Sequence, residues 1–404
     1  MNVGATVVLL GVTSLFADIS SEMISATLPL FLLMTLRFSP FAIGVADGIY
    51  QGAAVLVRVL SGVASDRWRR PKDIATCGYG LSALSRLALI VAGVGGAAPI
   101  FGAIVVDRIG KGIRTAPRDA MIAASSPRGM LATSFGVHRA MDTAGAMLGP
   151  LFAFALLTVV GPRFDAIFVV SFCVAVVGVA VIALFVRNPD QSVPGDDDRV
   201  DAAESPAPAA PTFADGITLF REPAFRTVIL VGSALSLITV SDGLLYLALR
   251  QRVGIQPNVF PLLYVVTALA FMTLAIPVGR LADRIGHEVT FVLGYGLLAV
   301  VYALLLLPHP NAFVAMLLLV MLGAYYAATD GVLMALASSM LPSELRATGL
   351  AVLTTGTGLA RLIASALYGA LWAWLGIDRT LAIFTLSLCS VLWIARRTIV
   401  RTSR

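Results

Sequence analysis

The sequence predicts an all-α membrane protein with twelve transmembrane helices arranged as two six-helix bundles. Only 13% of its 404 residues are charged and 58% are hydrophobic, with a mean hydropathy of +0.90, whereas soluble domains carry about 25% charged residues. Apolar runs recur along the whole chain, as in Val289–Leu307, and about 20 such residues span a bilayer. Helices satisfy every backbone polar group within one segment, and the sequence lacks the short alternating segments of a membrane β-barrel.

Twelve segments are long and apolar enough to cross the membrane. They lie at about residues 4–36, 40–64, 73–95, 97–118, 130–159, 163–186, 224–249, 257–281, 287–308, 310–340, 345–375 and 378–396. The first segment has no basic region ahead of it, so we expect a membrane helix and no cleavable signal peptide. A stretch rich in Pro, Asp and Ala, without an apolar face, follows the sixth segment. The predicted domains are therefore an N-terminal six-helix bundle (1–186), a linker (187–222) and a C-terminal six-helix bundle (223–404).

The distribution of Arg and Lys between the loops predicts the orientation of these helices. One side carries three basic clusters, at Arg67, Arg69, Arg70 and Lys72, at Arg187, Arg199, Arg221 and Arg226, and at Arg396, Arg397, Arg401 and Arg404. The other side carries only Arg37, Arg163, Arg250, Arg252 and Arg379. Basic loops stay inside, so we expect both termini and the linker in the cytoplasm of a bacterial cell, with the chain passing repeatedly through the inner membrane.

The sequence argues against several kinds of partner, cofactor and activity. The net charge of +6 and pI of about 9.5 follow from the loop charges, so we expect no nucleic-acid partner. Cys77, Cys173 and Cys389 lie in apolar runs without metal-ligand spacing, and we expect no metal and no cofactor. Neither a phosphate-binding G-x-x-x-x-G-K-[ST] loop nor a catalytic constellation occurs, so the chain is predicted not to be an enzyme.

The two halves of the chain share sequence features at nearly fixed spacing. The second segment ends in GVASDRWRRPK from Gly62, and the eighth ends in GRLADRIGHE from Gly279. A further pair links ATSFGVHRAM at Ala132 with ATGLAVLTTG at Ala347. Such similarity indicates duplicated halves, and two six-helix repeats are typical of transporters.

On these motifs the chain resembles the major facilitator superfamily over nearly its whole length, with the fold of that name. The superfamily's loop signature G-x-L-a-D-R-x-G-R-[KR] matches the second copy well, while Ala64, Arg69 and Pro71 depart from it in the first. The resemblance implies a conformational latch, in which Gly allows close helix contact and Asp pairs with a basic residue or a helix N-terminus. Its residues are Gly62, Asp66, Arg67, Arg70, Gly279, Asp283, Arg284 and Gly286. The alternative is a basic loop that only sets topology.

Two further motifs resemble those of the superfamily's drug–proton antiporters. The R-x-x-Q-G motif corresponds to RIGKG from Arg108, with Lys111 in place of Gln, and GAMLGP at Gly145–Pro150 matches the start of G-x-x-x-G-P-x-x-G-G. We expect Gly145, Gly149 and Pro150 to serve helix packing. Together with SLFADISSEM and HRAMDTAGAMLGP, these stretches are similar to a bacterial branch linked to drug or siderophore export, most of whose substrates are unassigned.

The stretch DRIGKGIRTAPRD, Asp107–Asp119, places charge inside a membrane segment. Asp107, Lys111, Arg114 and Arg118 share one helix face by their spacing of four, three and four. Asp107 lies about 15 Å beyond Ala97, near the bilayer midplane. We expect Arg114 and Arg118 to form an anchoring surface at the cytoplasmic edge, where Pro117 kinks or ends the helix.

Other charges at membrane depth are candidate functional groups, because a central charge costs about 2.5–3.5 kcal/mol unless it is paired or hydrated. The proton-coupling candidates are Asp18, Glu22, His138 and Asp142, with Glu22 and Asp142 favoured. The substrate or charge-network candidates are Asp47, Arg58, Arg86, Asp107, Arg108, Lys111, Arg139, Asp242, Asp330 and Arg361. The alternative is a set of static salt bridges, the first choice being Asp107 with Arg108 or Lys111. Since most of these charges lie in the first half, we expect the second half mainly to shape an apolar pocket.

The sequence thus predicts a secondary transporter working by alternating access, an antiporter for efflux that couples protons to the export of a small organic molecule or drug. The interior Arg and Lys residues favour an anionic or carboxylate-bearing substrate, with a cationic drug as the rival. The alternatives are a lipid or lipid-linked flippase, an organic-anion importer of the same fold, and a sensor without transport activity. The expected partners are the small-molecule substrate, protons and the lipid bilayer, and we expect a monomer.

Overall fold

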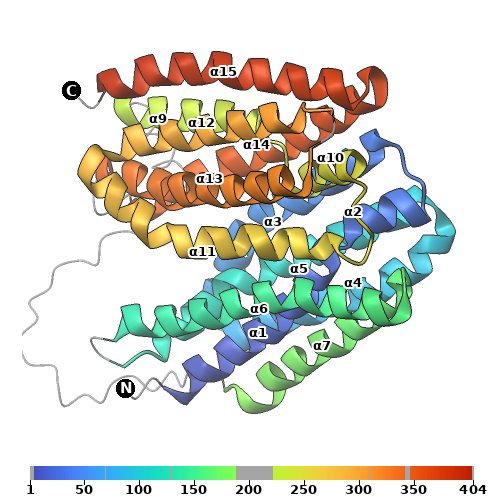
Figure 1. The fold of residues 1–404 in the computed structure, drawn as a ribbon. Helices are drawn as coiled ribbons and strands as arrows, with labels where there is room; N and C mark the ends of the chain where they lie inside the picture. Colours follow the sequence, from blue (N-terminus) through green and yellow to red (C-terminus); the bar gives the residue numbers. More distant parts are fainter. Residues whose placement is uncertain are drawn as a thin grey trace, which may run out of the picture.

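The computed structural model describes residues 4–68, 70–127, 130–187, 222–308, 310–341 and 346–402. Long helices run roughly parallel to one another in two groups, the first half of the chain below and most of the second half above (Figure 1). The start of α1 and the end of α15 lie at the same end of these helices, here called the termini side. Nearly all of the predicted linker 187–222 lies outside the described residues, and its boundaries stay a prediction.

The described helices correspond in order to the twelve predicted segments. The first half contains α1 (Ala5–Ser25), α2 (Leu28–Leu30), η1 (Phe31–Thr35), α3 (Pro40–Trp68), α4 (Pro71–Gly95), α5 (Ala97–Ala124), α6 (Leu131–Val160) and α7 (Phe164–Phe185). The second half contains α9 (Pro223–Leu237), α10 (Asp242–Val253), α11 (Phe260–Ile285), α12 (His287–Leu305), α13 (Ala312–Ser339), α14 (Arg346–Leu375) and α15 (Ile377–Thr402).

Helix boundaries follow local sequence signals. Pro residues open α3, α4 and α9, where the missing N–H costs no hydrogen bond. Single glycines with positive φ connect three consecutive helix pairs, at Gly96, Gly286 and Gly376. Only glycine adopts that conformation without strain, so these connections turn the chain within one residue.

The first helix of each half is interrupted. Pro29 follows the break between α1 and α2, where Thr27 donates its hydroxyl to the carbonyl oxygen of Met23 at 2.7 Å. Between α9 and α10, the hydroxyl of Tyr302 accepts from the amide of Val240 (2.7 Å) and donates to the carbonyl oxygen of Ile238 (3.1 Å). Side chains thus replace helical hydrogen bonds where the helix is broken. Both breaks adjoin the cavity described below.

Ten of the described segments are long and apolar enough to span a membrane; α5 is not among them, and most of the second half of α3 lies outside the residues searched. The charged residues Asp107 and Arg108 of α5 are buried in the protein interior, as shown below. Large apolar side chains such as Val159, Leu184 and Trp374 are instead strongly exposed on the outside of the bundle. This inside-out distribution is expected where lipid surrounds the helices.

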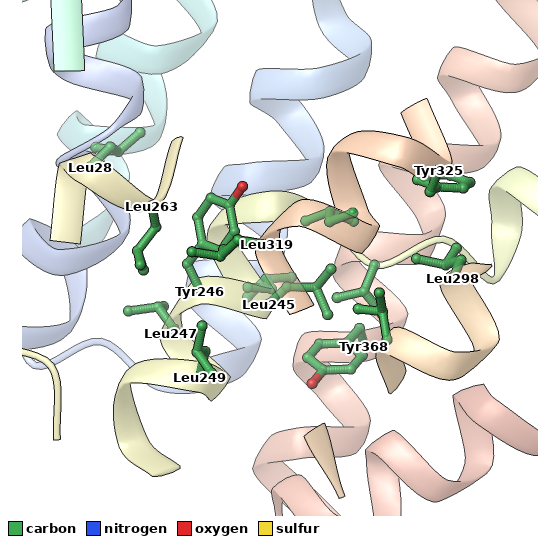
Figure 2. Packing of buried hydrophobic residues seen from close by; sticks show 14 of the residues in the cluster. Leu28, Leu245, Tyr246, Leu247, Leu249, Leu263, Leu298, Leu319, Tyr325 and Tyr368 are labelled. Atoms are coloured by element: carbon green, nitrogen blue, oxygen red, sulfur yellow. The ribbon is translucent and has the colours of Figure 1, made fainter. Parts of the chain in front are cut away.

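Helix α10 lies within the main apolar core. Its residues Gly243–Leu249 are all buried, and Figure 2 shows Tyr246 and the neighbouring leucines packed among side chains of several helices. The Tyr246 ring contacts Tyr264 edge-on, with a centroid separation of 4.7 Å, and its hydroxyl bonds to Thr267 at 2.7 Å. This packing fixes the start of α10, which carries Asp242.

The two halves meet where α3 packs against α14 and α6 against α11. Along α3, Gly44, Gly48 and Gly52 lie directly against α14: a Cβ on Gly48 would stand 2.6 Å from the carbonyl oxygen of Leu362. Small residues allow this close backbone approach. The contact lies in the first turns of α3, away from the termini side, so the halves are closed together there.

Candidate functional site

Helix α5 is longer than predicted, and more of its charged residues are buried than predicted. The helix continues through Pro117 to Ala124, so the prediction that it ends there was wrong, because neighbouring helices support it past the missing hydrogen bond. Arg114 is 3% exposed and Arg118 is also largely buried. The predicted anchoring role of these two residues was therefore wrong as well: both point into the first half.

Asp107 is enclosed by two arginines. Its Oδ1 accepts from Arg86 Nη1 and its Oδ2 from Arg108 Nη2, with Arg108 Nε donating to the same Oδ2 at 2.9 Å. The Arg86 guanidinium also donates to Ser20 (3.2 Å) and Ser21 (2.9 Å) of α1. All three charged groups are buried. The contacts fit a static network linking α1, α4 and α5.

A central cavity of about 330 Å³ lies between the two halves. Its lining comes from α1, α2, η1, α3 and α5 of the first half and from α10 and α11 of the second. The polar and aromatic lining residues are Glu22, Ser25, Asp47, Tyr50, Gln51, Arg108, Lys111, Asp242 and Tyr264. The guanidinium of Arg108 stacks over the Tyr50 ring at 3.6 Å. Because both halves contribute, the lining changes when they move relative to each other.

A second cavity, of about 740 Å³, lies on the termini side and is here called the termini-side cavity. Its charged lining residues are Asp18, Lys111, Arg114, Arg118, Asp119, His138, Arg139 and Asp142, from α1, α5 and α6. Lys111 and Ala54 line both cavities. The two spaces are therefore adjacent, with the Lys111 side chain at their boundary.

Within the termini-side cavity, the carboxyl groups of Asp18 and Asp142 lie near each other across the α1–α6 contact. Asp18 Oδ1 lies 3.5 Å from Arg114 Nη2, and Asp142 lies 3.8 Å from Arg118 and 3.9 Å from Arg139. These ion pairs are longer than charge-assisted hydrogen bonds of about 2.8 Å. The two carboxyl groups are thus held less firmly than Asp107.

His138 belongs to a hydrogen-bonded chain beside this pair. Its Nε2 lies 2.9 Å from Ser14 Oγ, which lies 3.1 Å from the Tyr79 hydroxyl and accepts from Arg118 at 3.3 Å. Ser14 and Tyr79 were not singled out from the sequence. The spacing of Ser14, Asp18 and Glu22 at four-residue intervals, which puts them on one face of α1, was the available signal.

The glycines of the two sequence motifs bring these helices together. A Cβ on Gly145 would stand 2.6 Å from the carbonyl oxygen of Leu15, and one on Gly149 would stand 2.7 Å from Glu22 Cβ. Gly112, at the end of the RIGKG stretch, packs against Val57 and Ala54 of α3. Pro150 lies inside α6, which continues to Val160. These contacts place Asp18 and Glu22 directly against α6.

The second half contributes more than the apolar walls expected from its composition. Asp242 accepts a 2.5 Å hydrogen bond from the Tyr326 hydroxyl and lines the central cavity. Asp330 lies 3.6 Å from Arg361. A small adjoining space of about 110 Å³ connects this cluster to α3 through Gln51. The expectation that the second half mainly shapes an apolar pocket was therefore wrong.

Some predicted site residues line neither cavity, and others have side chains outside the described part of the structure. The side chains of Arg58, Gly62, Asp66 and Arg67 are not among the described ones. In the second copy of the signature, Asp283 faces His287 at 3.4 Å near the surface. The predicted close contact at Gly279 is not observed, since no heavy atom would lie within 4 Å of a Cβ there.

Of the remaining signature residues, Arg70 and Arg284 are exposed and Gly286 is half-buried, and Arg139 is exposed as well. Gly286 ends α11 at φ +99°, Arg284 lies in its last turn, and Arg70 pairs with Asp73 at 3.0 Å in an exposed ion pair. The Arg139 side chain is 82% exposed. The ion pairs that Arg70 and Asp283 form among the described residues lie within their own halves, and the latch stays a prediction.

A polytopic helical protein with a polar cavity enclosed by two halves belongs to the class of membrane carriers. Comparison with known proteins agrees: the model of the Major Facilitator Superfamily matches residues 10–365 and 229–402. The chain belongs to the major facilitator superfamily, as its motifs predicted, and is a multi-pass membrane transporter of small molecules, not an enzyme.

Two relatives and several solved structures are similar to the chain. An uncharacterized MFS-type transporter of Methanocaldococcus jannaschii is 31% identical over 376 residues, covering 91% of this chain and 88% of the relative. An uncharacterized protein of Mycobacterium tuberculosis is 32% identical over 157 residues, covering 38% of this chain and 37% of that protein.

Among solved structures, a peptide transporter POT gives a TM-score of 0.79 at 15% identity, covering 99% of this chain and 95% of that one. The nucleoside transporter NupG gives 0.76 at 14%, covering 97% and 98%. A bacterial homologue of the human lysosomal transporter Spinster gives 0.76 at 14%, covering 98% and 97%. At these identities the similarity confirms the predicted fold alone.

Proposed function

We propose that the chain exports a small organic molecule in exchange for protons, by alternating access of the central cavity to the two sides of the membrane. The observation that carries this proposal is the adjacency of the two cavities through Lys111. Substrate contacts in the central cavity then lie next to the carboxyl groups of the termini-side cavity, with Lys111 of α5 between them. Rocking of the halves about a midplane site exposes both together.

The proton site in this proposal is the pair formed by Asp18 and Asp142. Two carboxyl groups in contact bind one proton between them, because ionising both places like charges side by side. Removing that proton leaves Arg114 and Arg118 as the compensating charges. Both carboxylates sit on the α1–α6 contact, so a change in their pairing acts on the packing of two helices. Glu22, one turn along α1, connects the pair to the central cavity.

The proposed direction and orientation rest on sequence features. The basic loops favour cytoplasmic termini, which makes the termini side the cytoplasmic one. The likeness of Arg108–Gly112 and Gly145–Pro150 to antiporter motifs favours efflux. The glycine contact of α3 with α14 supports a state open to the cytoplasm, because the halves are held together on the other side.

The test is flux in proteoliposomes with an imposed pH gradient, using a panel of organic acids, siderophores and cationic dyes. The wild-type chain should move at least one compound against its gradient, and the protonophore CCCP should abolish that movement. Asp142→Asn should reduce gradient-driven flux to the level of empty liposomes. Substrate exchange at equal pH on both sides should continue in this variant.

Asp165→Asn is the matched control, because its exposed ion pair with Arg163 lies far from both cavities. Undiminished gradient-driven flux in Asp142→Asn and Glu22→Gln would show that these carboxylates are not the coupling groups. Accumulation inside right-side-out vesicles would instead indicate an importer.

A further inference from the structure

We propose that the central cavity binds zwitterions, that is, small molecules with a carboxylate at one end and an amine at the other. The proposal deepens the proposed function, since it takes this cavity as the substrate site. It differs from the anionic substrate suggested by the count of Arg and Lys residues, and it follows from where the charges of each sign are placed along the cavity wall.

The cationic end of the cavity is formed by Arg108 and Lys111 on one face of α5. Arg108 is fixed by Asp107 on one side and by the Tyr50 ring on the other. Among the described residues, Lys111 makes no ion pair within 4 Å, and the acidic groups that act on it, Asp18 and Glu22, lie beyond that range. An ammonium group without a close partner is free to bind a carboxylate.

The acidic end is formed by Asp47 of α3 and Asp242 of α10, which interact with each other. Asp47 Oδ2 is buried and accepts no hydrogen bond from a described residue. Asp242 accepts one hydrogen bond, from Tyr326. The nearest cation, Arg361, is already paired with Asp330. Among the described residues, this end therefore has no cation paired with either carboxylate within 4 Å, and only neutral donors such as Tyr326 and Ser365 lie beside them.

Small residues leave room at the acidic end. A Cβ on Gly243 would stand 2.9 Å from Pro29 Cγ and 3.3 Å from the Tyr264 hydroxyl, so a side chain there would collide with the cavity wall beside Asp47. Ser365, which is 1% exposed, has an unpartnered hydroxyl near Asp47. An amine with three N–H donors could bind these oxygens.

The two ends are separate. Arg108 and Lys111 lie on α5, and Lys111 also borders the termini-side cavity, whereas Asp242 of α10 also borders the small space lined by Tyr326 and Arg361. Apolar side chains of Leu28, Leu32 and Ile43 line the wall of the same cavity. A molecule with one charge leaves the opposite end of the cavity uncompensated, whereas a zwitterion compensates both.

Two of the arginines that the sequence placed at membrane depth, Arg86 and Arg139, do not line this cavity. Arg86 is engaged with Asp107 outside it, and the Arg139 side chain is largely exposed. Of the described cations only Arg108 and Lys111 reach the central cavity, against the three carboxylates Glu22, Asp47 and Asp242. The lining therefore favours neither a simple anion nor, given Lys111, a simple cation.

The test uses ω-amino acids of four to eight carbons, each with the alkyl carboxylate and the alkylamine of matching length. Binding to the purified full-length chain in detergent is measured by the shift of its Tm with ligand concentration. At the best length, the zwitterion should bind roughly ten- to a hundredfold more tightly than either singly charged analogue, as expected for one charge-assisted hydrogen bond.

Two variants separate recognition from a general structural effect. Lys111→Gln should weaken the zwitterion and the alkyl carboxylate but not the alkylamine, whereas Asp242→Asn should weaken the zwitterion and the alkylamine but not the alkyl carboxylate. Lys111→Arg should retain zwitterion binding, and Asp165→Asn should match wild type throughout. Each variant is compared at a matched ligand-free Tm baseline, so a loss of folding cannot imitate the crossed pattern.

The proposal is overturned if one singly charged analogue binds as tightly as the zwitterion and the variant at the other end has no effect. It is also overturned if no member of the series raises the Tm. Because binding is measured without a gradient, this failure is distinct from that of proton coupling: a chain that binds zwitterions yet shows no gradient-driven flux contradicts only the proposed function.

Discussion

At the scale of single residues, Asp107 and Asp142 differ in what surrounds them. Asp107 has an arginine on each oxygen, in close contact and out of reach of the larger cavity. Asp142 has only long ion pairs and lines the termini-side cavity. Two carboxylates inside the helical bundle thus have different environments, one typical of a structural ion pair and one open to exchange.

Asp107→Asn should destabilise the protein, because it leaves Arg86 and Arg108 buried without their shared counterion. Breaking a buried pair in this way costs about 3–5 kcal/mol, so the Tm of the purified chain should fall well below that of Asp165→Asn. An unchanged Tm would mean that the network contributes nothing to stability.

At the scale of elements, α5 carries too many charged residues to qualify as a membrane span by composition, and its inward face lines the central cavity together with that of α3. Their charged and small residues serve the interior and the contacts between halves instead of lipid. The glycines of α3 illustrate this, because they form the contact with α14 that holds the halves together away from the termini side.

Gly48→Val should weaken that contact, since even its Cβ would stand 2.6 Å from the Leu362 carbonyl oxygen. We expect the halves to separate on the side opposite the termini. Spin labels at Phe41 of α3 and Trp374 of α14, both exposed, should report a longer or broader distance distribution.

Gly80→Val in α4 is the matched control, because a Cβ there meets no heavy atom within 4 Å. If both variants gave the same distance distribution between the spin labels, the α3–α14 glycines would not be what closes this side. The three native cysteines are exposed and must be replaced before labelling.

At the scale of the whole molecule, the two halves contribute different chemical groups to the polar interior. The first half supplies the arginine network and the paired carboxyl groups, and the second supplies Asp242 at the start of a buried half-helix. Rigid-body movement of the halves would therefore change the distance of Asp242 from Asp47, Arg108 and Lys111, which all belong to the first half.

Fusions to each terminus test the proposed orientation. With cytoplasmic termini, green fluorescent protein should fluoresce at either end and alkaline phosphatase should be inactive at both, since the phosphatase needs an oxidising compartment to form its disulfides. Active phosphatase at either terminus would contradict the orientation inferred from the loop charges.

The sequence by itself determined the helical membrane class, the order of the segments and the family, because apolar length, loop charge and repeated motifs are local properties of the chain. It also identified Asp18, Glu22 and Asp142 as charges at membrane depth. The tertiary structure alone decided which charges pair: Arg114 and Arg118 turn inward, Asp107 binds Arg86 from another helix, and Asp242 reaches the cavity. Pairing depends on distances between helices far apart in the sequence, and those distances are set by packing at residues such as Gly44, Gly48 and Gly145, whose contacts no helical periodicity specifies.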